Sequence, residues 1–337
     1  MAMSEPGVVV VLAPNWLGDA VMALPAVADL RRHFSGDTLV VAARASVSSL
    51  FTLVPGIDSI VNADVPSIRG TGASVAVLFP NSFASAWLVK RSGVPERWGY
   101  SADLRRLILT RAIRRPRTPM HQSEYYQQLV GALGIENGPR ETALAIPPDA
   151  LQNARTLLAE HGWDPERPLV VLAPGAAYGK AKQWIPTHVV QLTTDLVRTR
   201  GTMCALVGSR GDAAAIRAIR SAAPADCQPR IFDLAGLTTL PVLAAIMSLA
   251  RACVSNDSGA MHLAAAAGAP TVAIFGPTNE RATAPLARPR VSVAVITNQV
   301  WCRPCMLREC PIDHRCMTGI EPHHVVAAID RIARVIA

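Results

Sequence analysis

Residues 252–274, ACVSNDSGAMHLAAAAGAPTVAI, contain the pattern that decides the fold. Ala252–Ser255 and Thr271–Ile274 are short apolar runs that predict two strands, and the alanine-rich stretch between them predicts a helix. A glycine and a proline separate this helix from the second strand. A strand, a helix and a strand in succession are typical of a parallel sheet with crossover helices.

The same alternation occurs in both halves of the chain. In the first half we expect strands at Val8–Leu12, Thr38–Ala43 and Val75–Phe79, and helices at Ala26–His33 and Ser123–Leu133. In the second half we expect further strands, with helices between them, at Leu169–Ala173, Met203–Val207, Ala252–Ser255 and Thr271–Ile274. The chain is therefore predicted to be an α/β protein with two Rossmann-like, doubly wound domains.

A stretch rich in glycine and proline, Ile135–Asp149, is the expected linker between the halves. The expected domains are residues 1–145 and residues 146–337. Ligands of open parallel sheets bind outside the carboxyl ends of the strands. We therefore expect the two domains to face a central cleft that holds the ligands.

Length and composition limit the class of protein. The chain has 337 residues, 50% of them hydrophobic, which is enough for two folded cores. Its longest uncharged run, Ser258–Asn279, is interrupted by glycines and prolines, so it predicts no transmembrane helix. Val8–Leu12 is too short to be the apolar region of a signal peptide. We expect a cytoplasmic protein with free thiols.

The formal net charge of +8 has a local origin. Between Lys90 and Arg117 there are nine basic residues but only two acidic ones, Glu96 and Asp103. A solvated surface is one interpretation, and an anionic partner such as phosphorylated lipid headgroups or anionic sugars is the other. The arginines have few aromatic residues between them and no helix-turn-helix or zinc-finger spacing, so nucleic acid is not an expected partner.

A glycine-rich loop, PGAAYGKAKQWIP at residues 174–186, follows the expected strand Leu169–Ala173. Gly175 allows a ligand to approach the backbone closely, and the loop leads into a helix whose amino end favours anions. The chain contains only three lysines, and two of them, Lys180 and Lys182, lie in this loop. A compact ammonium group suits a phosphate oxygen, so the loop predicts a diphosphate site. An ordinary surface turn is the alternative.

A second loop, NDSGAMH at residues 256–262, begins the alanine-rich helix. Asp257 or Ser258 can cap this helix, and Gly259 keeps its first turn open. His262 lies one turn further, on the same side as Ser258. The loop is a second candidate anion site. A helix cap with a buried core histidine is the alternative.

A third loop, APNWLGD at residues 13–19, follows the first expected strand. Asp19 is expected to face the cleft from the side opposite the two anion loops, where a general base deprotonates an attacking sugar hydroxyl. The alternative is that Asp19 caps the helix that Pro25 helps to begin.

Four cysteines form a separate cluster late in the chain: Cys302, Cys305, Cys310 and Cys316. The first pair has metal-ligand spacing and His314 is a further candidate ligand, so a structural zinc is one interpretation. An ordered thiol-rich loop and a labile disulfide are the others. The remaining cysteines are expected to be buried in or near core strands: Cys204, Cys227 and Cys253.

Four groups of residues in the chain resemble motifs of glycosyltransferase family 9, the ADP-heptose:lipopolysaccharide heptosyltransferases. They are NWLGDAVM at 15–22, RWGY at 97–100 with LILT at 107–110, PGA at 174–176 through KQW at 182–184, and NDSGAMH at 256–262 with FGP at 275–277. The resemblance spans nearly the whole chain. In the first and third motifs it is closer to heptosyltransferase II than to heptosyltransferase I.

The resemblance implies a GT-B architecture, with an amino-terminal acceptor domain and a carboxyl-terminal nucleotide-sugar domain. It implies an inverting transfer of L-glycero-D-manno-heptose from ADP to the inner core of a Kdo-lipid A type precursor at the cytoplasmic face of the inner membrane. Asp19 matches the proposed base, and Lys182 matches a contact of the donor's phosphates and sugar. Further donor contacts are implied at Asp212, Asp257, Ser258, Gly259 and His262.

The remaining expectations follow from these loops and this resemblance. Gly175 and Lys180 are expected to help bind the donor, and His262 to assist catalysis together with Asp19 and Lys182. The expected acceptor contacts are Asn15, Trp16, Asp19, Arg97, Arg105 and Arg106. The chain has no pair of acidic residues at a recognisable metal-binding site, so we expect no obligatory metal or other cofactor. ADP-heptose is the expected co-substrate. Another sugar transferase of the family, a sugar-nucleotide epimerase and a non-catalytic binder remain as alternatives.

Overall fold

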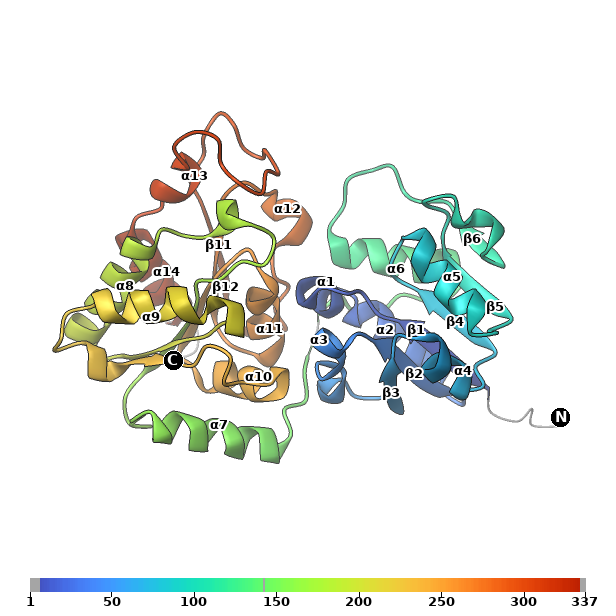
Figure 1. Ribbon diagram of the computed structural model, residues 1–337, viewed down its shortest axis with the longest axis horizontal. Helices are drawn as coiled ribbons and strands as arrows, with labels where there is room; N and C mark the ends of the chain where they lie inside the picture. The colour runs from blue at the N-terminus through green and yellow to red at the C-terminus, as the bar shows by residue number, and fades with distance from the viewer. Residues whose placement is uncertain (1–6, 142, 334–337) are drawn as a thin grey trace. The chain divides into compact units, whose positions relative to one another are not determined.

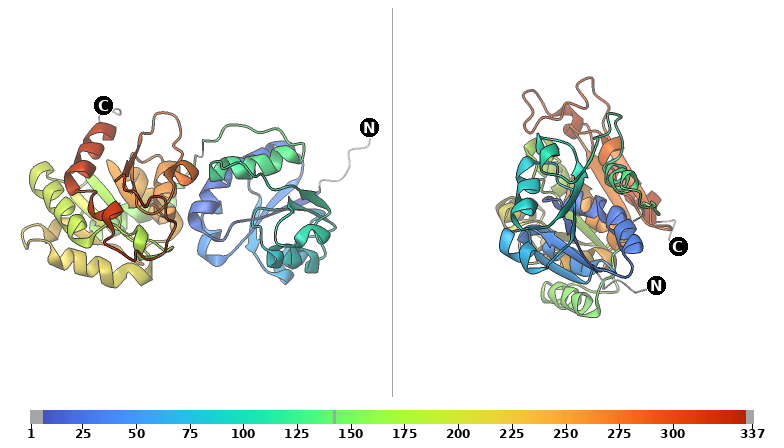
Figure 2. Two further views of the ribbon diagram at one scale, coloured as in Figure 1. Left: turned by 90° about the horizontal axis from the view of Figure 1, so that it is seen from above. Right: turned by 90° about the vertical axis from the view of Figure 1, so that its right-hand side faces the viewer.

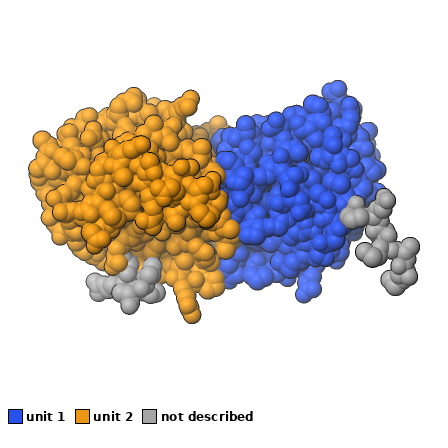
Figure 3. Space-filling model, turned by 90° about the horizontal axis from the view of Figure 1, so that it is seen from below, with its two compact units in different colours: residues 1–142 blue, residues 143–337 orange. Residues whose placement is uncertain are grey.

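The computed structural model describes residues 7–141 and 143–333. The chain divides into two compact units, residues 1–142 and 143–337, which are coloured separately in Figure 3. Within the expected linker Ile135–Asp149, the described residues form no helix or strand until Pro148, and Thr142 lies outside the described residues. Each unit contains its own sheet and is described by itself.

Unit 1 contains a six-stranded parallel sheet with the strand order β3-β2-β1-β4-β5-β6 (Figure 1). Val10 of β1 lies opposite Val40 on one side and Ala76 on the other, in the middle of the sheet. The strands are β1 (Val8–Leu12), β2 (Thr38–Ala43), β3 (Ser59–Asn62), β4 (Val75–Leu78), β5 (Glu96–Tyr100) and β6 (Arg111–Ile113).

Helices cover both faces of this sheet (Figure 2). α4 and α5 pack on the face that carries Val10, Leu12 and Leu78, while α2 packs against α6. Ser82 caps α5 by accepting a hydrogen bond from the backbone N–H of Ser85 at 3.2 Å. The helices of unit 1 are α1 (Leu17–Met22), α2 (Leu24–His33), α3 (Ala45–Ser48), α4 (Val65–Gly70), α5 (Phe83–Arg91) and α6 (Gln122–Ala132), with 3-10 helices η1 (Phe51–Leu53) and η2 (Arg105–Leu107).

Unit 2 also contains a six-stranded parallel sheet, with the order β12-β11-β10-β7-β8-β9. Its central strands are buried along their whole length, as expected for a parallel sheet covered on both faces. The strands are β7 (Leu169–Ala173), β8 (Met203–Leu206), β9 (Ile231–Asp233), β10 (Ala252–Asn256), β11 (Thr271–Phe275) and β12 (Val293–Thr297).

Alternate side chains of the second sheet pack on opposite helical layers. Leu172, Val254 and Ile274 pack with α8, α9 and α14, whereas Ala273 and Phe275 pack with Met261 of α11. The helices are α7 (Pro148–Glu160), α8 (Pro186–Arg200), α9 (Ala213–Ala222), α10 (Leu240–Leu249), α11 (Gly259–Ala267), α12 (Glu280–Thr283), α13 (Arg315–Thr318) and α14 (Pro322–Ala333), with 3-10 helices η3 (Lys180–Lys182), η4 (Arg210–Asp212) and η5 (Gln228–Arg230).

The two sheets have the same doubly wound topology. Starting from β9, the second sheet has the order third, second, first, fourth, fifth and sixth strand of its unit, which is also the order of the first sheet. The predicted α/β fold with two Rossmann-like sheets is confirmed, as are all seven expected strands to within a residue at their ends. In each sheet the strand order reverses between the first and fourth strands, and this switch point is where such sheets bind ligands.

No helix among the described residues combines the length and the apolar character needed to span a bilayer.

Candidate functional site

The two predicted anion loops of unit 2 follow neighbouring strands. The lysine loop, residues 174–183, follows β7, and the turn at Asp257 and Ser258 follows β10. β7 and β10 pair in parallel at the switch point of the second sheet. Both loops therefore lie at the carboxyl edge of that sheet, where ligands of this topology bind.

An ion pair joins the two loops directly. The Lys182 Nζ atom lies 2.6 Å from an Asp257 carboxylate oxygen, and both side chains are largely buried. The Thr278 hydroxyl donates a hydrogen bond of 2.6 Å to the same oxygen. Lys182 also lies over the Tyr178 ring, 4.8 Å from its centre. The interpretation of this loop as an ordinary surface turn is therefore wrong for Lys182, whereas Lys180 is exposed.

Asn256, the last residue of β10, holds both ends of the lysine loop. Its side-chain amide donates a 2.6 Å hydrogen bond to the carbonyl of Pro174 and accepts a 3.1 Å hydrogen bond from the backbone N–H of Trp184. The side chain is almost fully buried. One residue of the second loop thereby fixes the shape of the first.

Asp212 lies against the start of the lysine loop. A Cβ atom added to Gly175 would lie 2.7 Å from an Asp212 carboxylate oxygen, so a side chain at this position would require Asp212 to shift. The other carboxylate oxygen accepts hydrogen bonds from the backbone and hydroxyl of Ser209, at 2.8 and 2.7 Å. The structure thus brings Gly175 and Asp212, which are distant in sequence, to one place.

The turn before α11 has the predicted cap. Ser258 is the N-cap residue, and its hydroxyl accepts a hydrogen bond from the backbone N–H of Ala260 and lies 3.1 Å from the hydroxyl of Ser255. Gly259 begins the helix. His262 lies one turn further and is buried. This burial agrees with the core-histidine alternative, so a direct role of His262 stays a prediction.

The cysteine loop, residues 301–316, packs against the lysine loop, although the two are far apart in sequence. The Arg308 carbonyl accepts a 2.9 Å hydrogen bond from the backbone N–H of Ala181. The Nε2 atom of His314 lies 2.7 Å from the Ala181 carbonyl, to which it donates. The Tyr178 hydroxyl donates to the carbonyl of Met306 at 2.9 Å. The cysteine loop therefore braces the segment that carries Lys182.

The zinc interpretation of the four cysteines in this loop is not supported by the structure. They are free thiols, and no cluster of three or more histidine, cysteine or acidic side chains in the described part of the chain is arranged to hold a metal ion. His314 uses its Nε2 atom for the hydrogen bond to the Ala181 carbonyl. Burial and the neighbouring cysteines raise the pKa of Cys316. The expected burial of Cys204, Cys227 and Cys253 is confirmed.

In unit 1 the loop after β1 places Asp19 in the first turn of α1. Asp19 does not cap the following helix, because α2 begins at Leu24 with Ala23 as its N-cap residue, so the capping alternative is wrong. Burial, and next the nearby charge of Asp19, raise the pKa of Tyr126 in α6 well above its usual value. The Tyr126 phenol therefore stays protonated at neutral pH. Asn15 and Trp16, before the helix, are exposed.

A pocket opens at the carboxyl ends of β1, β2 and β4 in the same unit. Asn15, Arg44, Pro80 and Ser82 are among the residues that line it. Arg44 is exposed and forms no ion pair with any described residue. Arg44 was not predicted as a site residue, although it lies directly after the expected strand Thr38–Ala43, where ligand-binding residues of such sheets occur.

One of the arginines expected to bind an acceptor, Arg105, is buried in unit 1. Arg105 is 0% exposed, and its guanidinium donates hydrogen bonds to the carbonyls of Tyr100 and Pro80, to the Ser85 hydroxyl and to the side-chain oxygen of Asn81. Burial lowers the pKa of Arg105 to about 10, so the group remains charged at neutral pH.

Arg97 also donates hydrogen bonds to backbone carbonyl groups of unit 1. It donates hydrogen bonds to the carbonyls of Val94, Pro95 and Ile108, at 2.7, 2.6 and 2.8 Å. The expectation that Arg105 binds an acceptor is therefore corrected, because it is buried and its donors are bonded within unit 1. These hydrogen bonds of Arg97 use its Nε and Nη1 atoms, so contact of Arg97 with an acceptor stays a prediction. Arg106 remains exposed.

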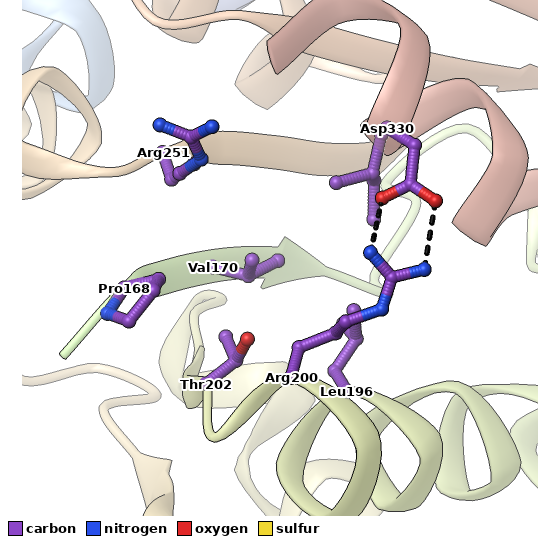
Figure 4. A pocket seen from close by; sticks show the side chains of 8 residues that line it. Pro168, Val170, Leu196, Arg200, Thr202, Arg251 and Asp330 are labelled. Carbon is purple, nitrogen blue, oxygen red and sulfur yellow. Dashed lines mark hydrogen bonds and ion pairs between the residues drawn. The ribbon is translucent and has the colours of Figure 1, made fainter. Parts of the chain in front are cut away.

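Another hollow of unit 2 lies away from these loops. Figure 4 shows it between Pro168, Thr202 and Arg251, which precede β7, β8 and β10 at the amino edge of the sheet. Arg200 and Asp330 pair across it through two hydrogen bonds of 2.6 and 2.7 Å. Parallel sheets bind ligands at the opposite edge, so we do not include this hollow in the site.

Comparison with known proteins identifies the family. Residues 65–315 match glycosyltransferase family 9 (heptosyltransferase). The chain belongs to this family. The expected glycosyltransferase is thereby confirmed, and an epimerase or a non-catalytic binder is not favoured.

Individual family members agree over nearly the whole chain. Lipopolysaccharide heptosyltransferase 2 of Salmonella typhimurium is 28% identical over 317 residues, which are 86% of this chain and 88% of the relative. The structure of E. coli ADP-heptose lps heptosyltransferase II aligns with a TM-score of 0.82 at 25% identity, covering 97% of this chain and 98% of that one. An E. coli heptosyltransferase solved with ADP has the same fold, with a TM-score of 0.70 at 15% identity over 96% of this chain and 99% of that chain. The resemblance to heptosyltransferase II is confirmed.

Proposed function

We propose that this family 9 glycosyltransferase transfers L-glycero-D-manno-heptose from ADP-heptose to the inner core of a Kdo-lipid A type precursor, with inversion at the anomeric carbon. Relatives of this chain are named as heptosyltransferase 2, and one structural neighbour is described as an ADP-heptose enzyme. We propose unit 1 as the acceptor domain and unit 2 as the donor domain.

The observation that carries the proposal is the Lys182–Asp257 pair between the two loops at the switch point of unit 2. A lysine ammonium group has three N–H donors, and one is directed at Asp257. The others are available to a diphosphate, which the amino end of α11 also favours. The charge that grows on departing ADP is stabilised by the same lysine and helix, so the proposed reaction requires no metal or other cofactor.

The other predicted donor residues have proposed roles near this pair. Gly175 allows the nucleotide to approach the backbone, and Asp212, beside it, accepts a hydrogen bond from a ribose hydroxyl. Lys180 supplies a second, exposed positive charge. Ser258 and Gly259 present backbone N–H groups at the start of α11. His262 is proposed to support this turn from the core.

In unit 1 we propose Asp19 as the general base. The acceptor hydroxyl oxygen forms a bond to the anomeric carbon of the heptose, the bond from that carbon to the ADP oxygen breaks, and Asp19 takes the hydroxyl proton. Asn15 and Trp16, beside Asp19, are proposed to orient the acceptor. Arg44 and Arg106 are proposed to attract its carboxylates and phosphates.

We propose that the enzyme works at the cytoplasmic face of the inner membrane, where a lipid-anchored acceptor is presented. The decisive experiment supplies purified protein with ADP-heptose, with and without Kdo-lipid A, and measures released ADP and the mass of the lipid product. We expect ADP and a heptose-bearing product only when both substrates are present. ADP release without acceptor, or conversion of the donor to an isomer, would contradict the proposal.

A further inference from the structure

α5 and η2 are neighbouring elements of unit 1 that both carry exposed apolar and basic side chains. The two elements pack against each other. Their exposed apolar side chains are Phe83, Trp87, Leu104 and Leu107, and the exposed basic residues beside them are Lys90, Arg91 and Arg106. We call these seven residues the docking surface.

The fold presents two leucines of this surface to solvent. Leu104 is 91% exposed and Leu107 is 93% exposed. Arg105, between them, is fully buried and bonded to the Ser85 hydroxyl of α5. Asp103 and Leu104 adopt left-handed backbone conformations, with φ of 46° and 59°. The loop is therefore held from beneath by a buried arginine while its leucines remain in water, an arrangement that contributes no core packing.

The aromatic part of the surface lies on one side of α5. Phe83 and Trp87 are four residues apart in the helix, and their rings stack with centres 6.3 Å apart. Lys90 Nζ lies 5.6 Å from the centre of the Trp87 ring. Tryptophan beside a long basic side chain is typical of the interface between lipid headgroups and acyl chains, because both have an apolar body and a polar end.

The charges of the docking surface distinguish it from another exposed apolar segment, the cysteine loop with Trp301 and Ile312. In the cysteine loop Arg303 pairs with Glu280, and Arg315 pairs with Asp313. Lys90, Arg91 and Arg106 form no ion pair with any described residue, and the only acids from Lys90 to Arg117 are Glu96 and Asp103. The docking surface thus carries uncompensated positive charge beside its apolar side chains.

We propose that the docking surface binds the surface of an anionic lipid bilayer, with the leucines and aromatic rings entering the headgroup region and the cations contacting lipid phosphates. Apolar insertion and attraction to anionic lipid act together at such interfaces. The inference rests on the proposed function, because a lipid-anchored acceptor requires an enzyme at the membrane. No described helix spans the bilayer, so the contact is peripheral.

The test is vesicle flotation of the full chain without acceptor or donor. Vesicles of phosphatidylethanolamine with phosphatidylglycerol are compared with vesicles of phosphatidylcholine. We expect wild-type protein to float with the anionic vesicles, and binding to weaken as salt screens the charges. The variant Leu104→Ser with Leu107→Ser should reduce the partition constant by about tenfold or more, since two nearly fully exposed leucines no longer enter the lipid.

A matched variant of the cysteine loop, Trp301→Ser with Ile312→Ser, should float like the wild type. A variant with Phe83→Ser and Trp87→Ser tests the aromatic part of the docking surface in the same flotation assay, where its binding should also weaken. Thermal unfolding checks that each protein is folded. Absence of wild-type binding to anionic vesicles, full binding by the leucine variant, or loss confined to the cysteine-loop variant would each overturn the proposal.

The proposed activity is tested separately, with detergent-dispersed acceptor. There the leucine variant should release ADP at the wild-type rate. Failure of transfer with normal flotation counts against the proposed function alone, whereas failure of flotation with normal transfer counts against the docking surface alone.

Discussion

Lys182 and Asp257 form an ion pair of 2.6 Å between two loops that are far apart in the sequence. The pair is shielded from water, and Thr278 adds a second hydrogen bond to the carboxylate. Such a pair keeps the ammonium group at a defined point above the carboxyl edge of the sheet. The side chain does not have to be ordered when a phosphate binds.

Replacing Lys182 by alanine should weaken binding of ADP and slow transfer. A phosphate contact acts in both the ground state and the transition state, so the donor dissociation constant and kcat/KM should both change, the latter by about 10²–10³. Calorimetric titration with ADP and steady-state kinetics measure the two effects. Lys180→Ala is the matched control. If Lys180→Ala lost donor affinity and Lys182→Ala did not, Lys180 would be the residue that contacts the phosphates.

Asp19→Asn should abolish most transfer while leaving ADP affinity unchanged, because only the proton acceptor is removed. We expect kcat to fall by about 10²–10⁴. Asp103→Asn, at an exposed aspartate of the same unit, serves as the control. Wild-type turnover of Asp19→Asn on Kdo-lipid A would exclude Asp19 as the base.

Arg105→Gln should destabilise unit 1. The substitution leaves buried carbonyl groups such as that of Tyr100 without a partner and opens a cavity, at a cost of about 2–5 kcal/mol in the free energy of unfolding. Arg106→Gln, one residue further and exposed, should change stability by less than about 0.5 kcal/mol. Urea denaturation measures both. Equal stability of the two variants would mean that Arg105 does not support the fold.

His314→Asn tests whether the cysteine loop positions the lysine loop. Asparagine tolerates the left-handed backbone of His314, at φ 55°, but removes the imidazole that donates to Ala181. Loss of one hydrogen bond predicts that the Michaelis constant for ADP-heptose rises by about fivefold to tenfold with a smaller change in kcat. His323→Asn, at an exposed histidine of α14, is the control. An unchanged Michaelis constant would show that the cysteine loop does not position the lysine loop for donor binding.

The cysteines should differ in their reaction with iodoacetamide. Burial raises the pKa of Cys204 and of Cys253, and the thiolate is the reactive form, so both should resist alkylation near neutral pH. Cys305 is exposed and should react first, with Cys316 slower because its pKa is also raised. Peptide mass spectrometry over time gives the order. Labelling of Cys253 as fast as Cys305 would show that the core of unit 2 opens readily.

The local pattern of the sequence was sufficient to predict the two sheets and the loops at their switch points. Apolar runs such as Val8–Leu12 are buried on both faces of a parallel sheet, so they are continuous and easy to recognise. β5 was not predicted because Glu96 and Arg97 give it a polar sequence. The short β6 and β9 are sheet edges, where burial imposes little pattern.

Parts of the site depend on contacts that sequence spacing does not reveal. The hydrogen bond between His314 and Ala181 joins residues more than a hundred positions apart, so the cysteine motif suggested a metal site rather than a contact with the lysine loop. Arg105 was expected on a basic surface because composition does not distinguish a buried arginine from its exposed neighbour Arg106. Asp19, Lys182 and Asp257 were identified because each follows a central strand directly or within a short loop.

The clamp that Asn256 places on Pro174 and Trp184 affects how fast and how tightly unit 2 can capture a nucleotide. A flexible phosphate-binding loop loses conformational entropy when its ligand binds, and that loss lowers the affinity. In unit 2 the side-chain amide of Asn256, at the end of β10, already holds both ends of the loop through hydrogen bonds. Binding of the proposed donor, ADP-heptose, should therefore cost little ordering entropy in this loop, so that more of the binding energy can align the anomeric carbon.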